Sequence, residues 1–221
     1  MSVVIRITGV IILVAALADK ADAQLDFLRK IFEPQVFQVS EKLRDYIRTE
    51  LPPPTHDRLQ ELKNVDLIFV KAMEFSKKQI PTCLLAASIA VLNRTDIKPT
   101  FPLLGMIRLP LPAEDSSDAA ARIRNLPRYI FSDSPQDSFG DSDKLVHFFG
   151  SAYLSYATGT NQVPDAIGKW IEDGEVAFKL DTKVDPRDVF ANELGQQFGV
   201  AISQGRDVLP SDFLNATYIK R

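Results

Sequence analysis

The chain of 221 residues contains one cysteine, two histidines and one tryptophan. A single cysteine excludes a disulfide bond within the chain. Cys83 stands in an apolar segment with no basic neighbour, so we predict a small buried side chain rather than a reactive thiol. Lysine and arginine form no cluster, and the formal net charge is −3. We therefore expect no binding to nucleic acid, which would require a basic surface.

The sequence also lacks the short motifs that mark common catalytic sites. It has no H-E-x-x-H zinc motif, no glycine-rich phosphate loop, no G-x-S-x-G nucleophile motif and no C-x-x-C pair. Any catalytic or binding group must then be assembled by the fold from residues that are distant in the sequence.

Long apolar runs are absent beyond the first residues of the chain. Arg6 precedes an apolar run from Val10 to Ala18, and residues 21–23 have the A-x-A order of a signal-peptide cleavage site. We predict that residues 1–23 are a secretory signal peptide and that the protein is periplasmic or secreted, either free or peripheral to the membrane. An uncleaved N-terminal anchor is the alternative. The run is too short for a stable span, so no transmembrane span is expected after signal removal.

Residues 24–142 are predicted to be helical and irregular. Apolar periodicity predicts helices over 25–50, interrupted at Pro34, and over 80–92, with a short helix from Glu114. Residues 57–76 suit a helix better than a strand. Residues 98–112 contain four prolines and no helical periodicity, which indicates an irregular or weakly β central segment.

Residues 143–221 are predicted to form a C-terminal three-helix unit, in one compact domain with 24–142. The helices cover Asp143 to Tyr156, Pro164 to Phe178, and a third that starts at Asp185 and Pro186, a typical N-cap and first-turn pair. The predicted fold class is therefore mainly α. Residues 208–221 are predicted to be a weakly structured tail.

Two of these helices carry polar stripes beside apolar ones. Helical spacing places Asp143, His147 and Ser151 on one face. In the third helix Asp188 and Asn192 share a face with two glycines, which would let another helix pack closely against an acid and an amide. In the second, Glu175 lies at the edge of the apolar stripe.

These motifs resemble a pattern shared by YfiM-like bacterial lipoproteins and VanZ-like envelope proteins. The resemblance covers about the last third of the chain: D-K-x-x-H-F from Asp143, S-A-x-L-S from Ser151, a helical Glu, and D-x-x-x-N-x-x-G-x-x-x-G from Asp188. It implies a bacterial envelope setting and three packed helices, and brings no known reaction. The chain departs from it in two ways. It lacks the spans of VanZ-like proteins and the lipid-bearing cysteine of a YfiM-like lipoprotein.

The candidate site consists of His147, Glu175, Asp188 and Asn192, with Asp143 orienting His147. One imidazole and two carboxylates would suit a divalent metal as the cofactor, with His147, Glu175 and Asp188 as ligands and catalytic groups. A ligand-binding role is predicted for the residues that can hold an anion or a polar group: Asp143, His147, Asn192, Arg124 and Arg128. The same groups could instead form a paired polar core without a ligand.

Two functions follow from these alternatives. The favoured one is a non-catalytic binding or envelope-interaction protein, with an envelope lipid or envelope protein as its partner. The other is a metal-assisted hydrolase of a phosphorylated envelope lipid or precursor, which would act through His147, Glu175 and Asp188 and hold the phosphate with Arg124 or Arg128.

Overall fold

The computed structural model describes residues 34–92, 96–97, 100–101, 105–106, 109–110, 114–137, 139–158 and 185–216. Within these ranges the chain is mainly helical, which confirms the predicted fold class. The predicted signal peptide, the predicted helix from Pro164 to Phe178 and Glu175 lie outside the described residues.

Between residues 34 and 92, which the structure describes, the chain forms α2 (Pro34–Thr49), α3 (Arg58–Phe75) and α4 (Ile80–Ala90). Pro34 is the first residue of α2, where its missing N–H costs nothing. Asp57 caps α3 by accepting the Leu59 N–H at 3.0 Å. Residues 57–76 are thus helical, as predicted. Helix α4 is short and apolar on all sides, so it lies at the centre of the fold, and its residues from Thr82 to Ala90 are buried.

The described residues of the central segment form two-residue strands in two antiparallel pairs. Strand β1 (Asp96–Ile97) pairs with β4 (Leu109–Pro110), and β2 (Thr100–Phe101) pairs with β3 (Gly105–Met106). In the sequence, β2 and β3 lie between β1 and β4. Helix α5 (Ser116–Asn125) follows, capped by Asp115.

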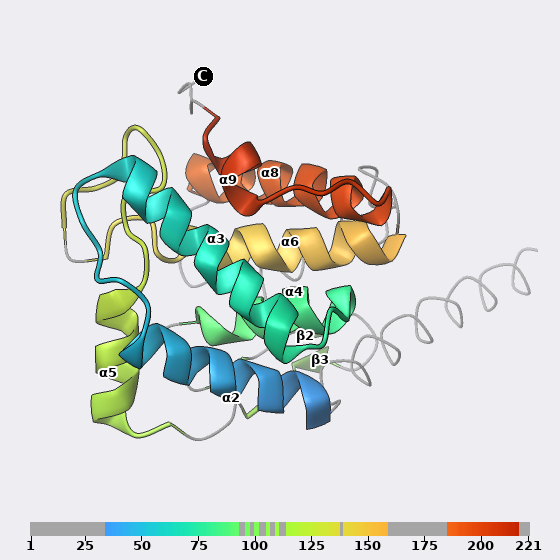
Figure 1. Cartoon of the computed structure of the whole chain (residues 1–221), viewed down its shortest axis with the longest axis horizontal. Coiled ribbons are helices and arrows are strands. Elements are labelled where there is room, and N and C mark those ends of the chain that lie inside the picture. The colour runs from blue at the N-terminus through green and yellow to red at the C-terminus, as the bar shows by residue number, and fades with distance from the viewer. Residues whose placement is uncertain are drawn as a thin grey trace, which may run out of the picture.

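Helices α6 (Lys144–Thr158) and α8 (Pro186–Ser203) lie side by side and run in the same direction (Figure 1). Two glycines of α8 make this close packing possible. A Cβ added at Gly195 would lie 2.2 Å from the Phe148 carbonyl oxygen, and one at Gly199 would lie 2.2 Å from that of Ala152. Asp185 caps α8 and Pro186 stands in its first turn, so the predicted start of this helix is confirmed.

The apolar core is shared by α2, α3, α4, α6 and α8. The Phe198 ring of α8 is in contact with three other aromatic rings, at centroid distances of 5.2–5.5 Å. These rings belong to Phe69, Phe148 and Phe213. The last of them belongs to α9 (Pro210–Leu214), a short helix in the segment that the sequence indicated as weakly structured.

The loop of residues 126–143 connects α5 to α6 and lies at the N-terminal ends of α6 and α8 (Figure 1). The buried Asp141 carboxylate joins the loop to α8 through Arg187 at 2.9 Å. The Phe131 and Phe190 rings, 5.3 Å apart, add an apolar contact between the same two segments. Asp141 and Phe131 of the loop are therefore held against α8.

Candidate functional site

The polar site at this end is centred on the buried ammonium group of Lys144. Its Nζ lies 2.7 Å from an oxygen of Asp143, 3.0 Å from one of Asp185 and 2.6 Å from Oδ1 of Asp188. Only 4% of the Lys144 side chain is exposed, whereas the three carboxylates are 24–39% exposed. A buried cation thus joins three acids that are still in contact with solvent.

The ion cluster stabilises the charged form of its members. Burial alone would lower the pKa of Lys144, but Asp143 and Asp188 outweigh it and raise that pKa above its ordinary value. Burial would likewise raise the pKa of Asp185. Hydrogen bonds from the Arg187 backbone, Lys144 and the Arg187 side chain prevail and lower it to about 2. Lys144 and Asp185 are therefore both charged at neutral pH.

His147 lies next to this cluster, one turn along α6 from Asp143. Its Nε2 is 3.5 Å from Oδ1 of Asp188, and Asn192 hydrogen-bonds to the imidazole. Burial is the main effect and lowers the pKa of His147 below its ordinary value. The Lys144 charge also lowers this pKa, whereas the Asp188 and Asp143 carboxylates raise it. The imidazole is therefore neutral at pH 7.

Ser151 completes the polar face of α6. Its hydroxyl donates to Oδ1 of Asn192 at 2.8 Å, and its side chain is buried. Because the hydroxyl donates to the amide rather than to His147, the arrangement is not that of a Ser-His-Asp triad, in which the serine oxygen transfers its proton to the imidazole.

A fourth acid, Asp141, lies on the loop beside the cluster and is buried. It accepts hydrogen bonds from the Phe131 N–H at 3.2 Å, from the Ser134 hydroxyl and from Arg187 at 2.9 Å. Burial raises its pKa despite these partners. Arg187 also pairs with Asp185 at 3.1 Å, so it links the loop to the cap of α8.

The structure brings together four of the residues that the sequence singled out: Asp143, His147, Asp188 and Asn192. Glu175 lies outside the described residues. Arg124 is exposed on α5, and Arg128 donates to its carbonyl oxygen instead of extending to the cluster. The cation that pairs with Asp141 is Arg187. Arg122, also on α5, is buried and pairs with Glu114 at 2.7 Å.

Lys144 and Arg187 are the functional-site residues that sequence reasoning did not single out. Both are charged residues at the start of a helix, where exposure to solvent is the usual expectation. The acids at positions 143, 185 and 188 would point to Lys144 as their partner only once the two helix starts are known to be adjacent.

This arrangement bears on the predicted metal centre. The described residues include no group of three or more histidine, cysteine, aspartate or glutamate side chains that could hold a metal ion. Lys144 lies between the carboxylates, in the position where a cation would bind them. A metal bound through His147 and Asp188 would have to displace the ammonium group or repel it. The predicted set that includes Glu175 stays a prediction.

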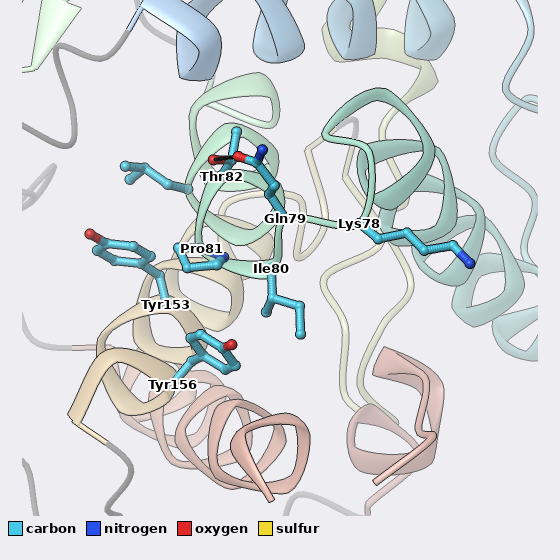
Figure 2. A pocket seen from close by; sticks show the side chains of 8 residues that line it. Lys78, Gln79, Ile80, Pro81, Thr82, Tyr153 and Tyr156 are labelled. Atoms are coloured by element: carbon cyan, nitrogen blue, oxygen red, sulfur yellow. Dashed lines mark hydrogen bonds between the residues drawn. The ribbon is translucent and has the colours of Figure 1, made fainter. Parts of the chain in front are cut away.

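A separate candidate is a pocket of about 460 Å³ toward the other end of α6, where Tyr153 and Tyr156 face the first turn of α4 (Figure 2). The remaining lining residues are Lys78, Gln79, Ile80, Pro81, Thr82 and Leu85. Figure 2 shows the Lys78 side chain extending away from the two tyrosines. The wall near the rings is thus apolar with neutral polar groups, and the volume is in the range of small-molecule sites.

No helix among the described residues is long and apolar enough to span a membrane. The chain matches no family model, no curated protein and no solved structure. The resemblance to the YfiM-like and VanZ-like pattern therefore stays a prediction that is based on the residues of this chain.

Proposed function

We propose that the protein is an exported bacterial cell-envelope protein that binds an envelope partner without catalysing a reaction. The observation that carries the non-catalytic part of this proposal is the position of Lys144. Its ammonium group neutralises the acids of the polar site from within, at 2.6–3.0 Å. Those acids are therefore committed to an ion pair and are poor candidates for a metal centre or a general base.

The geometry of the other polar groups favours the same conclusion. The Ser151 hydroxyl and the Asn192 amide bond to each other and are buried. A substrate would have to break these bonds and enter between two helices whose backbones are in contact at Gly195. The function is then carried by the outer surface of the fold, and the polar site positions that surface.

Thermal unfolding with and without metal ions tests the non-catalytic role. We expect the melting temperature of the exported protein to be unchanged by EDTA, Zn²⁺, Mn²⁺ or Mg²⁺. His147→Ala should lower it in every condition, because the removal of a buried polar partner costs about 1–3 kcal/mol. A metal-dependent rise that His147→Ala abolishes would contradict the proposal and favour the alternative, a hydrolase acting through His147, Glu175 and Asp188.

Export is tested by a separate measurement on the full chain. After expression in a bacterial host and cell fractionation, we expect the periplasmic fraction to contain a product whose first residue is Gln24, as shown by intact mass. A product of full length in the membrane fraction would mean that the N-terminal segment is an uncleaved anchor.

A further inference from the structure

Helix α3 carries a row of exposed apolar side chains on the side that faces away from its buried residues. Leu59, Leu67 and Val70 are 60%, 36% and 46% exposed. On a helix they fall within an arc of about 80°, and Lys63 lies inside that arc. Leu59, Lys63 and Leu67 are successive i,i+4 neighbours and Val70 is three residues after Leu67, so the row is continuous. In Figure 1 no described helix or strand crosses in front of α3.

Lysine side chains accompany this row along its length. Lys63 lies within the row, and Lys77 and Lys78 follow directly after the C-terminal end of α3. All three are exposed, and within the described part of the chain none of them pairs with an acid. This face therefore carries positive charge that the fold does not neutralise, although the formal net charge of the chain is −3.

The acids beside the row are each engaged by the fold. Glu74 pairs with Lys71 at 2.9 Å. Asp66 is half-buried and accepts the Ser211 N–H of α9 at 2.8 Å. Asp57 caps α3, where the positive end of the helix dipole offsets its charge. The groups left to attract a partner are then the three lysines.

Lys77 and Lys78 have backbone conformations that disfavour any side chain. Their φ angles are 54° and 64°, in the left-handed region where glycine is the usual residue. The turn is closed by the Lys77 N–H, which donates to the Glu74 carbonyl at 3.0 Å, and by the Lys78 N–H, which donates to the Met73 carbonyl at 2.8 Å. Glycine would form this turn with less strain. Lysine at both positions therefore indicates a role for the two charges outside the fold.

We propose that this face binds the anionic phospholipid surface of a membrane. We call it the α3 surface, defined by Leu59, Lys63, Leu67, Val70, Lys77 and Lys78. Contiguous exposed apolar side chains mark an interaction surface. Apolar side chains that alternate with lysine along one helix face are typical of helices that lie in the headgroup region, where lysine reaches the lipid phosphates. The inference rests on the proposed binding function and names the envelope partner.

Co-sedimentation with vesicles tests the proposal on the exported protein, which begins at Gln24 and lacks the apolar run of residues 10–18. We expect binding to vesicles of phosphatidylglycerol mixed with phosphatidylcholine. Binding should weaken at high salt, because salt screens the lysine charges. Vesicles of phosphatidylcholine alone should bind little protein.

Two substitutions separate the apolar from the charged part of the surface. Val70→Asp should weaken binding by about tenfold, because it places a carboxylate in the row. Val189→Asp is the matched control, because Val189 is 41% exposed on α8, and it should leave binding unchanged. The double variant Lys77→Gly, Lys78→Gly should also weaken binding by about tenfold. The same variant should raise the melting temperature, because glycine relieves the strain of the turn.

Several results would overturn the proposal: no binding to anionic vesicles, equal binding to both kinds of vesicle, equal loss in Val70→Asp and Val189→Asp, or undiminished binding by the double glycine variant. A dimer seen by sedimentation without vesicles, and dissociated by Val70→Asp, would assign the surface to a second copy of the chain instead of lipid. Failure of the proposed function has a different readout, the metal-dependent rise in melting temperature. A protein that is insensitive to metals and ignores anionic vesicles would contradict this inference alone.

Discussion

The Lys144 ammonium group is buried among acids that reach solvent, so its contribution to stability can be measured. Lys144→Met would remove the cation and leave the Asp143, Asp185 and Asp188 carboxylates facing one another. We expect a loss of about 2–3 kcal/mol in the free energy of unfolding, less than for a fully buried pair because water partly screens the acids. Urea denaturation measures it. Lys63→Met, at an exposed position of α3, should change little. Equal effects would mean that the cluster adds no stability.

His147 gives the site a pH dependence whose sign follows from its environment. Burial lowers the pKa of His147 in the folded protein below the ordinary value of 6.5. The unfolded chain therefore takes up the proton first as the pH falls. The stability contributed by the neutral imidazole is complete above pH 6.5 and is lost as the pH falls through 6.5 toward the folded-state pKa.

We therefore expect the wild-type protein to lose stability over this range and His147→Gln to lose less. The measurement is the free energy of unfolding at a series of pH values. Leu59→Ala is the control, because Leu59 does not titrate and is 60% exposed on α3, and its curve should run parallel to that of the wild type. A His147→Gln curve parallel to that of the wild type would show that the pKa of His147 is the same in the folded and the unfolded protein.

At the scale of secondary-structure elements, the contact between α6 and α8 depends on a residue without a side chain. Gly195→Ala would place a Cβ 2.2 Å from the Phe148 carbonyl oxygen, so the helices would have to separate. We expect a loss of at least about 2 kcal/mol, measured by denaturant unfolding. Gly150→Ala is the matched control on α6, because an added Cβ there meets nothing within 4 Å. It should stabilise the protein by about 0.5–1 kcal/mol. Similar losses in both variants would contradict this account of the packing.

Local chemistry made the elements predictable. Asp185 and Pro186 mark the start of α8 in any tertiary context, because a cap and a first-turn proline act on the adjacent backbone. The spacing of Asp188, Asn192 and Gly195 likewise predicted a polar face that packs closely. Helix α9 has only five residues, too few for apolar periodicity to distinguish it from a loop.

The partners within the site were harder to predict than its members. Asp143, His147, Asp188 and Asn192 stand out because each is polar beside apolar residues. The role of Lys144 depends on how two helix starts are placed relative to each other, which no local pattern specifies. Arg124 is exposed on α5, and Arg128 in the loop donates to the Arg124 carbonyl oxygen. Arg187 of α8 therefore takes the pairing with Asp141.

At the scale of the whole molecule, Arg58 holds together three segments that are far apart in the sequence. From the first turn of α3, its guanidinium donates to the Ile130 carbonyl at 2.8 Å and to the Leu214 carbonyl at 3.0 Å. It also donates to Oδ1 of Asn215 at 3.2 Å. The loop of residues 126–143 and helix α9 are thus joined through one side chain, and the loop also carries Phe139 and Asp141.

Arg58→Ala should therefore loosen the loop and α9 without unfolding the rest. We expect faster hydrogen exchange in residues 126–143 and 210–214, with the exchange of α2 and α4 unchanged, since those helices do not contact Arg58 through any of these bonds. Hydrogen exchange detected by mass spectrometry measures this. Arg48→Ala, which removes surface ion pairs to Asp45 and Asp118, should leave the loop and α9 unaffected. If Arg58→Ala instead raised exchange throughout the described helices, the loop would belong to the global folding unit.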